Sequence, residues 1–297
     1  MAINIVNKDK VQNIVKYFDC ILNTEQYIIS NLRNTFYSAT LRQTFIYGRL
    51  LWIFITSFGL AVAVFDVTHT ERHMPLLHST PGISEHSVFY YPVNIVLQLA
   101  FDIITLEFVV CSDLLIIVMI MYCNAEIKSI LALISSLNNE DIVGSEANVI
   151  LKIIHNVHVS FFENANQLTD VFWQIYFHKL FTILIYFCSA MFLLQSKDVS
   201  ILASLLCLVV IVVQSFLLCY FGQVLQNGSE EMANSLYMTK WYLLAIKDQK
   251  ILLILMNGFK NPIKVETFGF GVISYYTFVQ ICKASTSYAA IIYTLYL

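Results

Sequence analysis

Residues 200–222 read SILASLLCLVVIVVQSFLLCYFG and contain no charged side chain. A helix of about 20 consecutive apolar residues is long enough to cross the hydrocarbon core of a bilayer. Four further apolar runs, each at least as long, lie at 44–66, 93–122, 172–194 and 267–297. The pattern predicts an all-α, polytopic membrane protein with about five transmembrane helices.

The composition supports the same class of protein. Hydrophobic residues make up 58% of the 297 residues and charged residues 12%, against roughly 45–50% and 25% in soluble domains. The mean hydropathy is +0.69. This is too little charge to cover a soluble surface, and a net charge of −3 gives no indication of nucleic-acid binding.

Polar or amphipathic segments separate the apolar runs. Residues 1–43 have no apolar core followed by a cleavage site, so we do not expect a signal peptide. Apolar residues between Val11 and Leu22 recur every three or four positions, which predicts an amphipathic helix that either lies on the membrane or packs on other helices. The helical pattern of the second run continues past Tyr122, into the segment 123–171.

The basic residues predict the orientation of the chain. Thirteen lysines and arginines fall in the segments on one side of the predicted spans, and only Arg72 and Lys197 fall on the other. Because cytoplasmic loops are enriched in Lys and Arg, the N-terminus is predicted to be cytosolic, the C-terminus extracellular and the 67–92 loop extracellular. The sequon at Asn227 would then be cytosolic and unglycosylated.

Three carboxylates fall inside the second run, at Asp102, Glu107 and Asp113. Charges within a span are costly and usually face protein or water. They could form an ion or proton path, as in a secondary transporter, or they could have a structural role, either pairing helices or making a polar contact with a pocket. We favour the structural role, because no basic partner is evident in a neighbouring span and no inverted repeat is present.

No enzyme motif is present: the chain lacks H-E-x-x-H, G-x-S-x-G, a P-loop and the Rossmann glycine pattern. Four histidines cluster in the 67–92 loop and seven cysteines form no C-x-x-C pair. We favour an ordinary polar loop over a metal site, because metal-binding histidines need ordered hydrogen-bond partners and no helix is predicted in this loop. We therefore expect neither an enzyme nor a metal or other cofactor.

The last third of the chain carries an ordered series of motifs. They are QSFLLCYFG at 214–222, then Ser229, Ala233, Tyr237 and Trp241, then KNPI at 260–263, TF at 277–278 and KASTSY at 283–288. Their order and spacing resemble the carboxy-terminal third of the insect odorant receptor family, which shows Q-x-F-x-x-C-x-x-G and T-F-x-x-x-x-K-x-S-x-S-Y. The resemblance extends, more weakly, over essentially the whole chain.

The resemblance implies a ligand-gated cation channel in the plasma membrane. Family members assemble as tetramers with a shared co-receptor subunit, and their cytosolic extensions, here 223–266, form an anchor. Family members have seven spans, and this chain aligns with the third to the seventh. We therefore expect either a partial gene model or a short receptor.

The resemblance also implies two sets of site residues. A small apolar odorant would bind in the outer half of the membrane, in a pocket lined by aromatic and aliphatic side chains. The candidates on the first two spans here are Phe58, Val62, Phe65, Leu97 and Phe101. Packing against lipid is the alternative for each aromatic side chain.

The last helix would line the pore. Ile291 and Leu295 match the apolar gate positions of the family and, four residues apart, lie on one helix face. Apolar rings can gate a pore by dewetting. The same spacing would also suit packing against membrane lipids or another helix.

Overall fold

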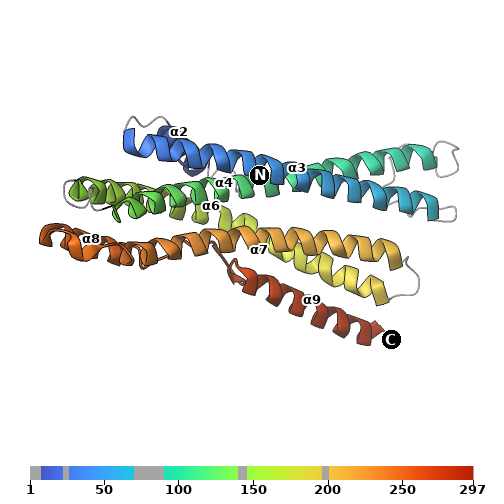
Figure 1. Ribbon diagram of the computed structural model, residues 1–297. Coiled ribbons are helices and arrows are strands. Elements are labelled where there is room, and N and C mark those ends of the chain that lie inside the picture. Colours follow the sequence, from blue (N-terminus) through green and yellow to red (C-terminus); the bar gives the residue numbers. More distant parts are fainter. Residues whose placement is uncertain (1–7, 23–26, 70–89, 140–145, 196–200, 297) are drawn as a thin grey trace. The chain divides into compact units, whose positions relative to one another are not determined.

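Helices form nearly all of the computed structural model, which describes residues 8–22, 27–69, 90–139, 146–195 and 201–296 (Figure 1). The predicted all-α fold is confirmed. The α-helices are α2 (Lys8–Leu22), α3 (Tyr27–His69), α4 (Tyr90–Ser136), α6 (Ala147–Gln195), α7 (Ile201–Tyr237), α8 (Ile246–Gly258) and α9 (Tyr275–Tyr296). A short 3-10 helix, η1 (Trp241–Leu243), precedes α8.

Three helical stretches of the described chain are long and apolar enough to cross a membrane. They are Pro92–Ser136, Ala147–Phe192 and Ser204–Tyr237, with 45, 46 and 34 residues. About 20 residues span the hydrocarbon, so each helix extends well beyond it. The predicted continuation of α4 past Tyr122 is observed, because the helix ends only at Ser136.

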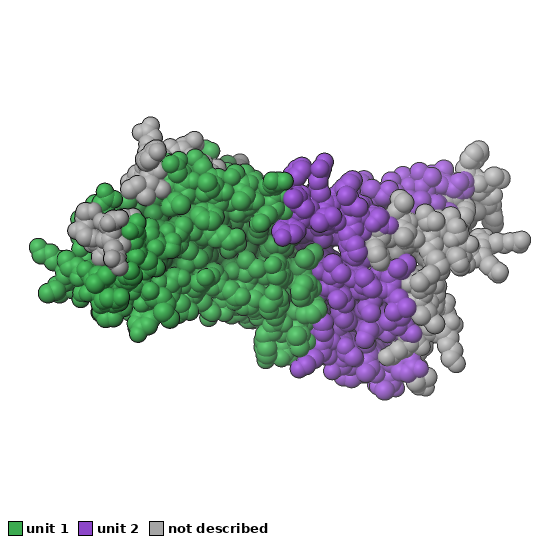
Figure 2. All heavy atoms as spheres, in the orientation of Figure 1, with its two compact units in different colours: residues 1–44, 117–182, 216–280 green, residues 45–116, 183–215, 281–297 purple. Residues whose placement is uncertain are grey.

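The chain divides into two compact units, coloured separately in Figure 2. Unit 1 comprises residues 1–44, 117–182 and 216–280, and unit 2 comprises residues 45–116, 183–215 and 281–297. Helices α3, α4, α6, α7 and α9 contribute residues to both units. Unit 2 therefore contains more than half of each predicted span, and unit 1 contains the rest of the spans together with the N-terminal segment and residues 123–171 and 223–266.

The amphipathic helix α2 packs into unit 1. Ile14, Phe18 and Ile21 on its apolar face are buried. The ring of Phe18 lies 5.5 Å from the ring of Tyr122 on α4. Of the two alternatives for this helix, the structure shows packing on other helices of the chain, which removes its apolar face from solvent.

A small hairpin precedes the last helix in unit 1. Strands β1 (Glu266–Thr267) and β2 (Gly271–Val272) pair antiparallel. Gly269 and Gly271 have φ angles of 79° and 73°, which favour glycine because it has no Cβ. The segment predicted as a span from residue 267 thus begins with a turn, and α9 starts at Tyr275.

Within unit 2, helices α3 and α4 approach closely at two glycines of α3. A Cβ on Gly59 would lie 2.8 Å from Leu106 Cδ2, and one on Gly48 would lie 3.2 Å from Leu114 Cδ2. Small residues allow such close approach between membrane helices. The two helices that carry the predicted odorant residues are therefore neighbours.

Candidate functional site

The five predicted odorant-binding residues all belong to unit 2 and lie on α3 and α4. Leu97 and Phe101 are one helical turn apart, with 51% and 58% of their surfaces exposed. The side chains of Phe58, Val62 and Phe65 lie outside the described part of the structure. The structure brings the two helices together, and the described candidates present apolar surface.

Two of the three intramembrane carboxylates bond to neutral side chains of other helices. Trp52 Nε1 on α3 donates to Glu107 Oε2 at 3.0 Å. Gln214 Nε2 on α7 donates to Asp113 Oδ2 at 2.6 Å. The side chain of Asp102 lies outside the described part. These hydrogen bonds favour helix pairing. The indole of Trp52 and the amide of Gln214 were not predicted as partners, because the prediction considered only basic side chains.

The candidate gate residues lie on the exposed side of α9. Ile281, Ser285 and Ala289, spaced four apart, are buried along one face of the helix. Ile291 and Leu295 are 53% and 82% exposed. An isolated chain thus leaves an apolar surface uncovered near the end of this helix, which marks a surface for lipid or another subunit.

The motif at 214–222 has a structural role at each of the four positions that the pattern Q-x-F-x-x-C-x-x-G specifies. Besides the bond from Gln214, the ring of Phe216 stacks on Tyr275 at 6.0 Å, and Cys219 is fully buried. A Cβ on Gly222 would lie 2.5 Å from the backbone oxygen of Ile273. The glycine is needed because the chain leading into α9 crosses α7 at this point.

The other motif residues in unit 1 hold the same region together. The buried hydroxyl of Ser229 accepts a hydrogen bond from Ile263 N at 2.8 Å. The Thr277 hydroxyl, also buried, donates to the backbone oxygen of Val272. Motifs far apart in the sequence therefore fix the connection between α7, the hairpin and α9.

A buried ion pair lies in unit 1. Arg33 Nε donates to Glu126 Oε2 at 3.1 Å, and Tyr37 OH donates to the same oxygen at 3.0 Å. Burial, and then the charge of Glu126, raises the pKa of the Tyr37 phenol well above its usual value. No sequence pattern predicted this cluster, since Arg33 is an ordinary basic residue of the N-terminal segment.

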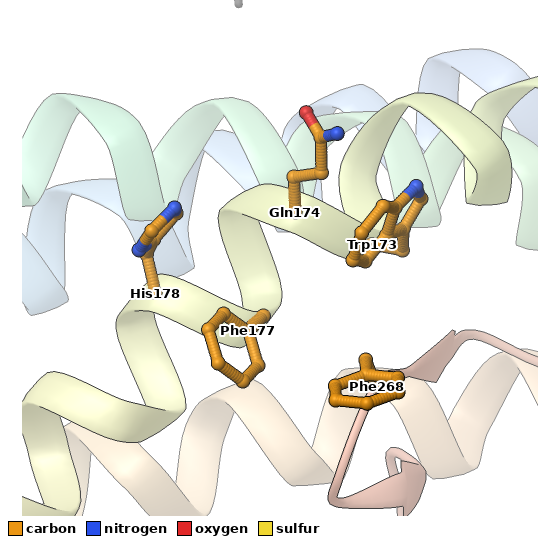
Figure 3. Close-up of a pocket in the computed structure, with 5 residues that line it drawn as sticks. All are labelled: Trp173, Gln174, Phe177, His178 and Phe268. Carbon is orange, nitrogen blue, oxygen red and sulfur yellow. The ribbon is translucent and has the colours of Figure 1, made fainter.

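Unit 1 also carries a hollow of about 430 Å³ between α6 and the hairpin, lined by Trp173, Gln174, Phe177, His178 and Phe268. Figure 3 shows Phe177 pointing from α6 toward the segment that bears Phe268, whereas the amide of Gln174 points to the other side of the helix. The Phe177 and Phe268 rings lie 6.4 Å apart. Sequence reasoning did not single out these residues.

The long apolar helices, linked by polar side-chain pairs, define a multi-pass helical membrane protein. Within that class, a family model described as 7tm Odorant receptor matches residues 10–286, and the chain belongs to the odorant receptor family. This is a receptor family and not an enzyme family.

Known proteins show the same likeness. A protein described as odorant receptor 92a of Drosophila melanogaster is 22% identical over 63% of this chain, which covers 46% of that relative. The chain thus spans about half the length of that relative. The insect olfactory receptor OR5 from Machilis hrabei, solved with eugenol, superposes with a TM-score of 0.81 over 99% of this chain and 77% of its own, at 14% identity. A second structure of the same receptor superposes with a TM-score of 0.80 over 98% of this chain and 76% of its own, at 13% identity. These two structures share the fold.

Proposed function

We propose that the chain is an odorant receptor subunit that binds a small, volatile, apolar molecule and gates a non-selective cation channel. The observation that carries the proposal is the family match over residues 10–286. The contacts at Gly222, Ser229 and Thr277 support it, because the motifs of the resemblance meet in one structural region. Binding must favour the open state over the closed state for the ligand to gate the channel.

The proposed ligand contacts are Phe58, Val62, Phe65, Leu97 and Phe101. The exposed Leu97 and Phe101 side chains support an apolar contact surface, which suits a ligand with few polar groups. An odorant with a long apolar body would contact both, since they lie one turn apart on α4. The five positions belong to neighbouring helices, which a single ligand could bridge.

The proposed assembly is a tetramer with a co-receptor subunit in the plasma membrane. The exposed apolar side of α9 supports a role at the central pore, with Ile291 and Leu295 as the gate. The charge distribution supports a cytosolic N-terminus and an extracellular C-terminus. Unit 1 would then be the cytosolic anchor.

Co-expression with an odorant receptor co-receptor in cells that lack both tests the function. We expect a panel of volatile apolar compounds to evoke cation current that neither subunit gives alone. Proton-coupled uptake without current would instead indicate a transporter that uses Asp102, Glu107 and Asp113. Silence in both assays, with surface delivery shown by labelling, would overturn the proposal.

Glycosylation tests the orientation. The natural sequon at Asn227 should leave gel mobility unchanged by endoglycosidase, because it would face the cytosol. The substitution His78→Asn creates an Asn-Ser-Thr sequon in the 67–92 loop and should add a removable glycan. Modification of Asn227, or none after His78→Asn in delivered protein, would contradict the topology.

A further inference from the structure

Two hollows of unit 1 meet at one tryptophan. The apolar hollow lined by Phe177 and Phe268 also has Trp173 in its wall. A second hollow of about 340 Å³ shares Trp173 and is otherwise lined by Asn166, Thr169, Asp170, Pro262, Lys264 and Glu266. Together they form one groove, called here the amphipathic groove, between α6 and the segment 262–268.

The polarity of the groove changes along α6. Asn166, Asp170, Trp173 and Phe177 follow one another at spacings of four, three and four, so they share a helix face. Eleven residues of helix cover about 16 Å. The change from polar to aromatic falls at the predicted start of the apolar run at residue 172. In the predicted topology, the groove therefore lies at the level where the membrane interface meets the hydrocarbon.

The apolar half is a preformed aromatic surface. Thr267 Oγ1 donates to the backbone oxygen of Trp173 at 2.9 Å, which fixes the hairpin on α6. Phe177 contacts both Phe268 and Phe270, with ring centroids 6.4 and 6.3 Å away. Phe268 nevertheless stays 77% exposed. Such an aromatic surface at the membrane level suits an acyl chain.

The polar half carries charges of both signs. Among the described residues the one ion pair is Arg33–Glu126, so Lys264, Asp170 and Glu266 have no ion-pair partner in this part of the chain. Two carboxylates and one ammonium in one hollow complement a headgroup that has both a cation and an anion. The indole of Trp173, between the two halves, can bind a quaternary ammonium through its face.

We propose that the amphipathic groove binds a zwitterionic phospholipid from the leaflet on the side of unit 1. Lys264 would contact the phosphate, Asp170 and Glu266 the ammonium group, and Phe177 and Phe268 an acyl chain. This inference rests on membrane insertion and not on odorant binding. The leaflet is the cytosolic one in the orientation proposed above.

Native mass spectrometry of the full chain in detergent, with added phosphatidylcholine or phosphatidylglycerol, tests the proposal. We expect the chain to retain phosphatidylcholine about tenfold more strongly, the factor that a cation–π contact between its quaternary ammonium and the Trp173 indole contributes in a desolvated site. The double substitution Asp170→Asn and Glu266→Gln should abolish this preference. Lys264→Ala should weaken both lipids, whereas the nearby Lys260→Ala should change neither.

A second variant examines the apolar half. Phe268→Ala removes an exposed side chain, so the unfolding temperature should stay at the wild-type value while retention of both lipids falls. Equal retention of the two lipids by the wild type would mean a non-selective annular lipid only and would overturn the proposal. Unchanged retention by Lys264→Ala would overturn it too. No odorant or current enters these readouts, so failure here is separate from failure of the receptor function.

Discussion

Glu126 lies at the centre of the buried polar cluster of unit 1. Its side chain is completely buried and receives bonds from Arg33 and Tyr37. A buried pair of charges is weak evidence for net stability, because both ions lose their hydration. Removing one partner is different, since the remaining charge stays buried without compensation.

We predict that Glu126→Gln lowers the free energy of unfolding by about 3 kcal/mol. The measurement is the denaturation midpoint of the purified chain in detergent. Glu163→Gln on α6 is a matched control, because Glu163 is exposed. Adding Arg33→Met to Glu126→Gln should recover part of the loss, as the unpaired guanidinium is removed. Equal midpoints for the two glutamate variants would contradict the role of the pair.

His158 gives unit 1 a dependence on pH. It is buried in α6, 4.1 Å from the ring of Phe259. Burial, and then the charge of His155, lowers its pKa from 6.5 to about 4. The folded protein therefore favours neutral His158, so its contribution to stability is complete above pH 6.5 and is lost as the pH falls from 6.5 toward 4.

We predict that lowering the pH from 7 to 5 destabilises the wild type and that His158→Phe reduces this dependence. Phenylalanine keeps an aromatic ring against Phe259 but cannot take up a proton. The full loss below pH 4 is on the order of 3 kcal/mol. Parallel unfolding midpoints of wild type and variant across this pH range would contradict the assignment.

At the scale of elements, the crossing of α7 and the hairpin depends on a glycine. The 2.5 Å separation between a Cβ on Gly222 and the Ile273 oxygen involves backbone, which cannot rotate away as a flexible side chain can. We predict that Gly222→Ala costs about 1–3 kcal/mol, measured as a lower unfolding midpoint. Gly258→Ala is the control, since its Cβ would meet nothing closer than His158 at 3.9 Å. Equal unfolding midpoints for Gly222→Ala and Gly258→Ala would mean that the crossing tolerates a side chain at residue 222.

The apolar runs predicted helices well because about 20 apolar residues have few alternatives to a span. The motif at 214–222 also marked a region that is structurally constrained. Helix continuation into unit 1 was visible only for α4, where the pattern persists past Tyr122. The hairpin was missed because residues 267–274 are apolar enough to read as a span, while the φ angles of Gly269 and Gly271 decide the turn.

The sequence predicted individual site residues better than it predicted their partners, because partners depend on tertiary packing. The hydrogen-bond partners of Glu107 and Asp113 depend on which helices pack together. That packing cannot be deduced from a single sequence. The amphipathic groove joins α6 to a segment about ninety residues later in the chain. Local periodicity contains no information about such a pairing, so the groove emerged only from the three-dimensional structure.

At the scale of the whole molecule, the proposed channel requires that α9 meet its equivalents in a pore. Ile291 and Leu295 are exposed in the single chain, and a ring of such side chains would exclude water when closed. We predict that Leu295→Ala, co-expressed with the co-receptor, raises the basal current or alters ion selectivity, and that Ile291→Ala does so too. Tyr293→Phe is the control, because Tyr293 is two residues from each gate position and so lies on the opposite face of α9; it should behave as wild type in whole-cell recordings. Wild-type currents from both gate variants at normal surface levels would remove the pore-lining role, because a narrow apolar constriction must widen when a side chain is shortened.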